Sequence, residues 1–455
     1  MKKTLFLLTI LPVSLPILAQ DPGNLTPYAT DSFMGGHGFV PKRTEVEPRI
    51  SRDDHEILEQ ARELSKNELP AAVQLLQNKI SGDPHCSSVF DFALATLLFQ
   101  QSRHTQAIRS YQATLEKTPN FLRARRNLAY VQIQQQAFAD AAKNLAKALN
   151  LGDASADTYG MLGYCHLMQG NHSSAENAYR FALVRDPGNT AIQNGLVRCL
   201  EATGRHEEAI ALLDELIYKN PGDPAYWLTQ VNALNQTGKH RRAIANIELL
   251  RRTGKATGPS LLLLGDLYLN IELPSRAHEA YSAALEIQGN LPPGHFIRAA
   301  TQLANQNAHE LAAQYANTIQ THYGSLLEKE DRRQFLRLRA RLALHAQQYT
   351  QAVQHLDNLL KDSPLDGAAL LLLGRTHAKL QDSTRAAIAF ERAAKTDSHA
   401  AAALLEHARM LVNQKDYQAG LKLLRQAQQI EPRSYVESYL LAVEKAAQSQ
   451  RGLDL

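Results

Sequence analysis

From about Asp53 onward, small residues recur along the chain at nearly fixed intervals of 34 positions, and a large apolar residue follows each of them four positions later. The small residues are Ala72, Ala107, Ala141, Ala175, Ala209, Ala243, Ala277, Ala352, Ala386 and Gly420. The large apolar residues are Leu76, Tyr111, Leu145, Tyr179, Leu213, Ile247, Tyr281, Leu356, Phe390 and Leu424. A spacing of four places both side chains on one face of an α-helix. Because prolines close many intervals, the pattern predicts two helices per interval, joined by a short turn.

One interval is longer than the rest, because 75 positions separate Ala277 from Ala352, which is two intervals and seven extra residues. In this frame the chain holds eleven repeats: 53–86, 88–121, 122–155, 156–189, 190–223, 224–257, 258–291, 292–332, 333–366, 367–400 and 401–434. The eighth repeat, 292–332, is therefore elongated. Leu311 takes its small-residue site, and we expect the segment HYGSLLEKEDRRQ either to extend its second helix or to add a loop.

The fourth repeat carries the fullest motif, ADTYGMLGYCHLMQGNHSSAENAYRFALVRDPGN. Its signature positions hold Tyr159, Leu162, Gly163, Ala175, Tyr179, Ala182 and Pro187. A helix–turn–helix of this length and pattern resembles the tetratricopeptide repeat. The resemblance implies an all-α fold, a superhelical solenoid of about eleven repeats over 53–434. Since each repeat buries its apolar face only against its neighbours, the segment 435–455 is expected to be a capping helix and tail.

The first 19 residues have the pattern of a secretory signal peptide. Lys2 and Lys3 precede an apolar stretch that ends at Ala19, and Pro12 and Pro16 interrupt it. The stretch is also shorter than the ~20 residues that span a bilayer. We therefore expect cleavage after Ala19 and export, to the periplasm of a bacterium or beyond it. The following segment, 20–52, is rich in Pro and Gly without helical periodicity, which predicts an extended or disordered arm.

Two runs of four leucines, in SLLLLGDLYLN and ALLLLGRTHAK, raise the question of a membrane span. Charged residues follow too closely for that, and we expect no transmembrane segment in the mature chain. Leu261, Leu264, Leu370 and Leu373 occupy signature sites and should be buried. Leu262 and Leu371 are expected to face a groove, with Leu263 and Leu372 beside it.

The net charge argues against nucleic acid as a partner, and the positions of the cysteines bear on whether they form a disulfide. Two of the four net positive charges are Lys2 and Lys3, so the mature chain is nearly neutral and nucleic acid is not an expected partner.

Cys165 and Cys199 hold the same site in adjacent repeats, about 8–10 Å apart, whereas a disulfide needs Cα atoms within ~7 Å. Buried free thiols are therefore expected there. Cys86 lies alone near a loop and is a candidate reactive thiol.

The chain lacks the motifs of known catalytic sites. It has no phosphate-binding glycine loop and no Gly-x-Ser-x-Gly elbow, and HELAAQ at His309 lacks the second histidine of a zinc protease. His104, His172, His206 and His240 share one site in the turn of their repeats. Equivalent sites about 8–10 Å apart are too distant to share a zinc ion with bonds of ~2.1 Å, so packing is the better account. We expect no enzymatic activity, no catalytic residue, no cofactor and no metal.

The resemblance also implies a concave groove lined by the first helices, with ligand contacts from the second, fifth, ninth and twelfth residues of each repeat. The ninth-position ladder is Thr96, Tyr130, Tyr164, Arg198, Asn232, Asp266, Ala300, Arg341, Arg375 and Arg409. The candidate partner-binding residues are Tyr130, Tyr164, Arg198, Asn232, Leu262, Arg337, Arg341, Leu371, Arg375, Lys379 and Arg409.

The basic C-terminal part of this ladder suggests an acidic peptide or a C-terminal carboxylate, held by bidentate guanidinium contacts. Alternatively, acidic residues of neighbouring repeats pair with these arginines, or solvent covers them. The tyrosines either contact a partner or pack between repeats.

Together these features favour a non-catalytic protein–protein interaction scaffold of the bacterial cell envelope that binds partner peptides in the groove. The arm segment DSFMGGHGFVPKRTEVEPRIS is similar to repeat proteins that accompany TonB/ExbB-type energy-transduction systems. The alternative is a carbohydrate-binding module of polysaccharide export, which a groove of Tyr, Asn and Arg would suit. A repeat-bearing enzyme would need a further catalytic domain.

Overall fold

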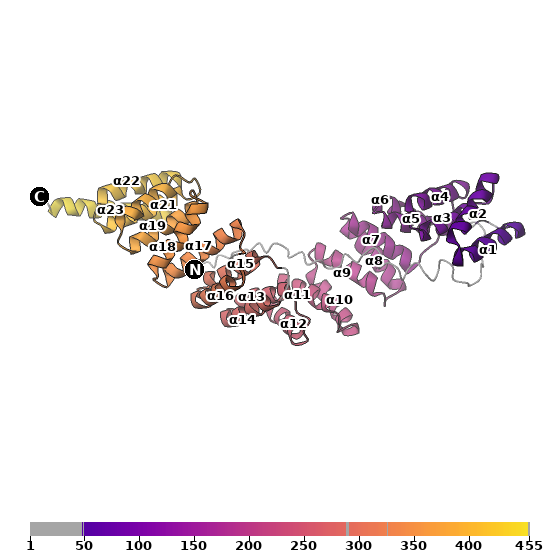
Figure 1. Cartoon of the computed structure of the whole chain (residues 1–455), viewed down its shortest axis with the longest axis horizontal. Coiled ribbons are helices and arrows are strands. Elements are labelled where there is room, and N and C mark those ends of the chain that lie inside the picture. Colours follow the sequence, from indigo (N-terminus) through magenta and orange to yellow (C-terminus); the bar gives the residue numbers. More distant parts are fainter. Residues whose placement is uncertain (1–47, 49, 288–290, 325, 454–455) are drawn as a thin grey trace. The chain divides into compact units, whose positions relative to one another are not determined.

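The computed structural model describes residues 48, 50–287, 291–324 and 326–453, and within these residues the secondary structure consists of 23 helices without strands (Figure 1). The helices form two bodies. The N-terminal body ends at Lys239 and the C-terminal body begins at His240. The predicted signal peptide 1–19 and almost all of the predicted arm 20–52 lie outside the described residues.

The helices of each body are short and follow one another closely. The N-terminal body contains α1 (Arg52–Asn67), α2 (Leu69–Gly82), α3 (Ser88–Gln100), α4 (His104–Lys117), α5 (Leu122–Gln134), α6 (Phe138–Asn150), α7 (Ala156–Met168), α8 (His172–Arg185), α9 (Thr190–Ala202), α10 (His206–Lys219) and α11 (Pro224–Gln236). The C-terminal body contains α12 (His240–Arg252), α13 (Gly258–Asn270), α14 (Pro274–Glu286), α15 (Pro293–Asn305), α16 (His309–Tyr323), α17 (Lys329–His345), α18 (Tyr349–Asp362), α19 (Gly367–Lys379), α20 (Ser383–Ala393), α21 (Ala400–Asn413), α22 (Tyr417–Ile430) and α23 (Ser434–Leu453).

Within each body the helices stack in the order of the chain. The two helices of a pair pack against each other, and the first helix of a pair also contacts the first helix of the next, as α5 contacts α7 and α15 contacts α17. The final helix, α23, packs on α22 and buries Val436, Val443 and Ala447. The predicted all-α fold of stacked helix–turn–helix repeats is confirmed.

Two local features mark the start and the end of the first helix in many pairs. Many first helices begin with a side-chain N-cap, from Ser51, Ser87, Ser155, Asn189, Asp223, Thr257 and Asp366. The turn that follows passes through one residue in the left-handed region, with φ between 58° and 75°. These residues are Ser102, Gln136, Gly170, Gly204, Gly238, Glu272, Asn307, Gln347, Gln381 and Lys415. Such a residue ends a helix while satisfying its last carbonyl groups.

The left-handed residues show that the register of the eighth repeat differs from the predicted frame by one residue. They recur every 34 positions, except that Asn307 follows Glu272 by 35 and precedes Gln347 by 40. One extra residue therefore precedes Pro293, and six more lie between Asn307 and Gln347. The small-residue site accordingly belongs to Ala312, which is fully buried, and the assignment of Leu311 was wrong. Ala300 is buried as well, so it does not belong to the accessible ladder.

Most of the extra residues after α16 lengthen the next first helix rather than α16 itself. Helix α17 has 17 residues where α15 and α19 have 13. The first turn of α17 contains Glu330 and Asp331, whose negative charges interact favourably with the helix N-terminus. The segment thus mainly adds an extra turn to α17, which neither predicted outcome included.

Side-chain sizes are matched where the two helices of a repeat cross. Gly163 faces Tyr179, Gly265 faces Tyr281 and Gly374 faces Phe390, and a Cβ atom at any of these glycines would lie within 3.0 Å of the ring. Other repeats hold alanine opposite leucine at the same two sites: Ala129 with Leu145, Ala340 with Leu356 and Ala408 with Leu424, all fully buried. In these six crossings glycine accompanies an aromatic ring and alanine accompanies leucine, as close packing favours, whereas Ala95 with Tyr111, both fully buried, departs from this pairing.

The leucine runs belong mainly to the core. Leu261, Leu264, Leu370 and Leu373 are buried as predicted. Leu262 is only 4% exposed, so its predicted place in an accessible groove is wrong, whereas Leu371 is partly exposed. Among the described helices, none has both the length and the apolarity to cross a bilayer.

The cysteines and turn histidines take part in packing. Cys165 and Cys199 are buried free thiols, and burial raises the pKa of Cys165 to about 12 and that of Cys199 to about 11. Cys86 is also buried, and burial raises its pKa, although the Lys117 ammonium acts in the opposite direction. A thiol with a raised pKa forms little thiolate, so the expected reactivity of Cys86 is not supported. The His104 ring lies 5.5 Å from the Phe99 ring, which is a packing contact.

Candidate partner-binding surfaces

The tyrosines of the predicted ladder pack between repeats in the N-terminal body. The Tyr130 ring on α5 lies 5.6 Å from the Phe99 ring, edge to face, and the Tyr164 ring on α7 lies 5.9 Å from Phe138 in the same manner. Burial raises the pKa of both tyrosine hydroxyls. Both residues nevertheless remain partly exposed. They therefore have a packing role, and their exposed parts stay accessible to a partner.

The same face continues with Arg198 on α9, which is exposed, and Asn232 on α11, which is partly exposed. Glu201, which follows Arg198 by one turn, was not among the predicted contact residues. Burial raises the pKa of Glu201 to about 7, while the charge of Arg198 acts in the opposite direction. Near neutral pH this carboxyl is partly protonated. The surface around Arg198 is therefore more positive than the sequence indicates.

In the C-terminal body, two predicted arginines share one carboxylate. Arg375 on α19 lies 2.8 Å from a carboxylate oxygen of Glu406, and Arg409 lies 3.2 Å from the same oxygen, both distances measured from a guanidinium nitrogen. Glu406 and Arg409 are on α21, the first helix of the next repeat. Arg375 thus pairs with an acidic residue of the neighbouring repeat, which was one of the alternatives to binding a partner. Lys379 is exposed at the end of α19.

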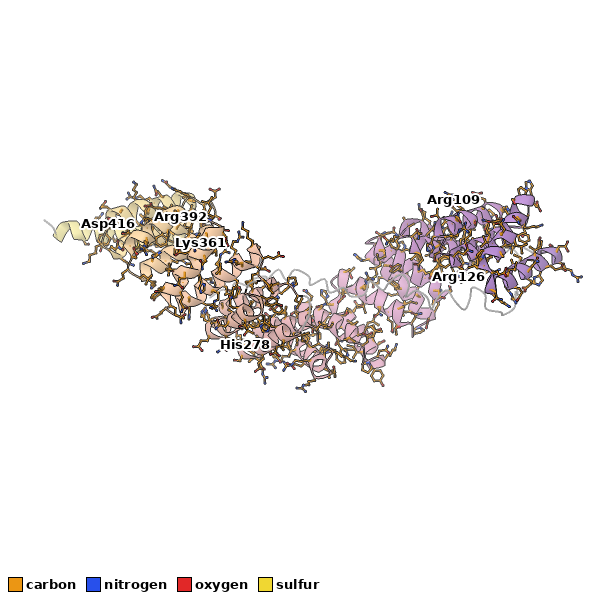
Figure 2. All side chains as sticks on the ribbon, in the orientation of Figure 1. Arg109, Arg126, His278, Lys361, Arg392 and Asp416 are labelled. Carbon is orange, nitrogen blue, oxygen red and sulfur yellow. The ribbon has the colours of Figure 1, made fainter. Side chains whose placement is uncertain are left out.

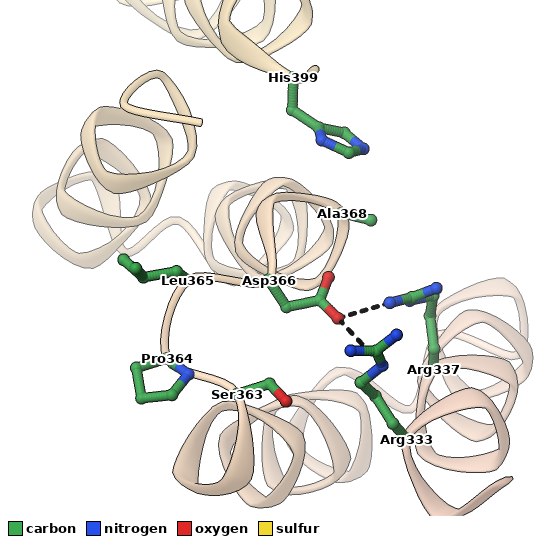
Figure 3. Close-up of a pocket in the computed structure, with 8 residues that line it drawn as sticks. All are labelled: Arg333, Arg337, Ser363, Pro364, Leu365, Asp366, Ala368 and His399. Carbon is green, nitrogen blue, oxygen red and sulfur yellow. Dashed lines mark hydrogen bonds and ion pairs between the residues drawn. The ribbon is translucent and has the colours of Figure 1, made fainter. Parts of the chain in front are cut away.

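A pocket of about 600 Å³ lies beside the N-terminus of α19 (Figure 3). Its lining comes from α17, from the turn between α18 and α19, from α19 itself and from the residue that precedes α21. The lining residues are Arg333, Arg337, Ser363, Pro364, Leu365, Asp366, Ala368 and His399.

Asp366 organises the polar side of this pocket, and its side chain is only 7% exposed. One carboxylate oxygen accepts a hydrogen bond from the Ala369 backbone N–H at 3.0 Å and caps α19. The other lies 2.5 Å from Nη2 of Arg337 and 4.0 Å from Nε of Arg333. Figure 3 shows both guanidinium groups directed at this carboxylate. Buried carboxylates are held in this way because an unpaired buried charge is costly.

The two arginines retain binding capacity after this pairing. Arg333 also pairs with Glu330 at 2.9 Å, yet the buried Nε atoms of Arg333 and Arg337 have no hydrogen-bond partner among the described residues. A guanidinium group has five N–H donors, so the carboxylates of Asp366 and Glu330 do not saturate the two arginines. An additional anionic oxygen in the pocket would bind the remaining Nη–H donors, because the Nε atoms are buried.

Part of the pocket lining is apolar. Pro364 and Leu365 form it, and Leu365 is 79% exposed, which is unusual for a large aliphatic side chain. The turn is fixed by Arg392, labelled in Figure 2, which donates a hydrogen bond to the Pro364 carbonyl at 3.0 Å. A lining that contains both arginine and apolar side chains suits a ligand that carries both an acidic and an apolar group.

The structure brings only part of the predicted site together. Of the eleven predicted contact residues, Arg337 alone lines this pocket. Its neighbours Asp366, Leu365 and His399 were missed, although the sequence Asp-Gly at 366–367 signals a helix start and so a possible anchor for a nearby arginine. Arg341 donates instead to the side-chain carbonyl of Asn305 at 3.1 Å.

Comparisons with known proteins agree with this architecture. Residues 92–157, 337–401 and 379–435 match one family model of the tetratricopeptide repeat, and residues 166–231 match another, which together cover just over half of the chain. The chain is 23% identical over 118 residues to the Hsp70-Hsp90 organizing protein 3 of Arabidopsis thaliana, a match that covers 26% of this chain and 21% of that protein. The chain thus spans about a fifth of the length of this relative.

Solved structures of similar proteins have limited overlap with this one. A tetratricopeptide repeat protein from Parabacteroides merdae is 19% identical, with 52% of this chain and 93% of that chain covered and a TM-score of 0.38. YrrB, a protein of the same family with an unusual peptide-binding site, is 17% identical, with coverages of 47% and 93% and a TM-score of 0.31. Repeats of this family imply a scaffold for protein–protein interactions. On its repeats, their packing and the matches to the family models, the chain belongs to the tetratricopeptide repeat family.

Proposed function

We propose that this protein is a non-catalytic scaffold that binds partner proteins through a peptide segment carrying an acidic and an apolar group. The observation that carries the proposal is the pocket at the N-terminus of α19. There, two arginines are held by a single buried aspartate, in a lining that also contains the exposed Leu365. Charge-assisted hydrogen bonds from guanidinium groups bind carboxylates strongly and with defined geometry. The apolar part of the lining adds affinity for a neighbouring large side chain.

We further propose that the scaffold acts in a bacterial cell envelope, in the periplasm, after removal of residues 1–19. The support is the pattern of Lys2, Lys3 and the apolar stretch that ends at Ala19. An accessory role beside a TonB/ExbB-type system is the narrower form of this proposal, based on the segment after Asp31. Mass spectrometry of the protein isolated from envelope fractions should find Gln20 as the first residue, and an intact Met1 end would contradict export by cleavage.

The scaffold function can be tested by photo-crosslinking from inside the pocket. A photoreactive phenylalanine analogue at Leu365 should capture one discrete protein partner, because this side chain lies at the rim of the proposed site. The same analogue at Lys361, exposed on α18 and outside the pocket lining, should not capture that partner. Mass spectrometry of the adduct identifies the captured segment.

A matched pair of substitutions on α17 provides the control. Arg337→Gln should lower the yield of the Leu365 adduct about tenfold, because a hydrogen bond to a charged group contributes about 1.5–3 kcal/mol. Arg332→Gln removes the same charge from an exposed position of the helix outside the pocket and should leave the yield unchanged. Equal yields in the two variants would contradict the proposal. Recovery of a glycan adduct without protein would favour the carbohydrate-binding alternative.

A further inference from the structure

A pair of stacked histidines lies in the C-terminal body, outside the pocket. His309 is the first residue of α16 and His345 is the last residue of α17. Their ring centroids are 3.6 Å apart and the ring planes differ by 27°. His345 is exposed and His309 is partly exposed. The pair is therefore accessible to solutes, and its stacked geometry couples the protonation of the two rings.

Arg341 lies next to this pair, one turn before His345 on α17. Its hydrogen-bond partner is Asn305, a neutral residue at the end of α15. The other arginines of the basic ladder each contact a carboxylate: Arg337 contacts Asp366, and Arg375 and Arg409 share Glu406. Within the described residues, no carboxylate lies at ion-pair distance from Arg341. Its positive charge is thus uncompensated.

The charges around His309 are of one sign. Burial is the largest cause that lowers the pKa of His309, and the positive charges of His345 and Arg341 lower it further. The helix α15 contributes the neutral Asn305, and α17 contributes Arg341 and His345. On α16 the next residue is Glu310, which is exposed and does not contribute to the pKa shift of His309. Burial and these two positive charges therefore oppose protonation of His309.

We propose that His309, His345 and Arg341 form a second anion-binding site, which takes a phosphate or carboxylate oxyanion as the imidazoles become protonated. Two imidazolium groups and one guanidinium group would supply several charged N–H donors to an anion of this kind. The anion in turn provides the missing negative charge. This site does not depend on the peptide-binding function of the pocket.

The direction of the pH dependence follows from linkage. A bound anion favours the protonated imidazoles, so it raises their pKa values, and by reciprocity protonation tightens anion binding. Without an anion, a single proton on the stacked pair repels the second. Binding is therefore weak above pH ~7 and strengthens as the pH falls below the unperturbed histidine value of ~6.5.

The test is an NMR titration of the full-length protein with ¹³C-labelled histidine, in which His309→Gln and His345→Gln assign the two signals. We expect inorganic phosphate to raise the pKa of the pair by about 0.5 or more relative to chloride at equal ionic strength. Acetate should have a smaller effect because it carries less charge. A pKa shift with acetate but not with phosphate would mean that the site binds carboxylates only. A pKa shift with phosphate alone would mean that it binds phosphates only. Absence of a shift with either anion would overturn the proposal.

Variants of α17 separate binding from a merely structural role. In Arg341→Gln, the pKa of His309 should rise without any added anion, because a repelling charge is lost, and the additional effect of phosphate should disappear. Arg332→Gln, on an exposed position of the same helix, should leave both values as in the original protein. A phosphate effect that persists in Arg341→Gln would show that these three residues do not act together.

Discussion

Gly265→Ala should destabilise the C-terminal body by about 2–3 kcal/mol, even though alanine favours helices more than glycine by about 1 kcal/mol. A Cβ atom at this position would lie 2.2, 2.4 and 2.7 Å from three ring atoms of Tyr281. That ring is fully buried, and its hydroxyl donates a hydrogen bond of 2.6 Å to Asp266, so it has no room to move aside. The loss is measured by urea unfolding, with hydrogen exchange to locate it in α13 and α14.

Two controls distinguish steric conflict from a general effect of the substitution. Gly82→Ala, at the end of α2, introduces a Cβ atom into open space and should be neutral or slightly stabilising. Adding Tyr281→Leu to Gly265→Ala should recover part of the loss, because Ala340 with Leu356 fills the same crossing in another repeat. Strictly additive losses in the double variant would contradict the matching of side-chain sizes.

Asp366→Ala should cost about 2–3 kcal/mol, because it removes two functions together. It removes the N-cap of α19, which contributes about 1 kcal/mol, and the carboxylate that compensates Arg333 and Arg337. Loss of one partner from a buried ion pair is costly because the remaining charge stays partly desolvated. Both arginine side chains are about one-third exposed, which moderates this second contribution. Urea unfolding with hydrogen exchange of α17 and α19 measures the effect.

Asp416→Ala is the matched control for this prediction. Asp416, labelled in Figure 2, caps α22 through a hydrogen bond from the Ala419 backbone N–H at 3.1 Å. No arginine pairs with it among the described residues, so its substitution should cost only the cap, about 1 kcal/mol. An equal loss in the two variants would mean that Asp366 does not hold the two arginines.

The sequence predicted the fold well because its main determinant is periodic. Small and large residues at a fixed spacing identified the helix pairs, and this spacing follows from helix geometry alone. The prediction failed at the eighth repeat because its frame was anchored on residue size. Asn307 sets the true register there through its left-handed backbone, and a left-handed asparagine, unlike a glycine, is not conspicuous in a sequence.

The candidate site was less predictable, since it depends on side chains from different repeats. The position of Arg337 on a first helix could be derived from its register, but its partner Asp366 lies in the connection between α18 and α19. Likewise, Glu406 contacts both Arg375 and Arg409, whereas Arg341 has only Asn305. These differences depend on rotamers and on local spacing, which a repeat pattern does not encode.

The stacking of His309 and His345 was missed for a related reason. The predicted frame placed the eighth repeat one residue early, so His309 did not align with His172 and the other turn histidines. The structure restores it to that site, at the start of a second helix. Its contact with His345 results from the packing of consecutive repeats, which no sequence motif indicates.

Selection of displayed random peptides against the full-length protein decides whether the pocket binds peptides that carry an acidic group. We expect the enriched peptides to contain a carboxylate next to a large apolar residue. Their Kd, measured by fluorescence anisotropy, should weaken about tenfold in Arg337→Gln, by about 1.4 kcal/mol, and remain unchanged in Arg332→Gln. Enriched peptides without an acidic group, or with equal affinity for both variants, would contradict the assignment of the pocket as the partner-binding site.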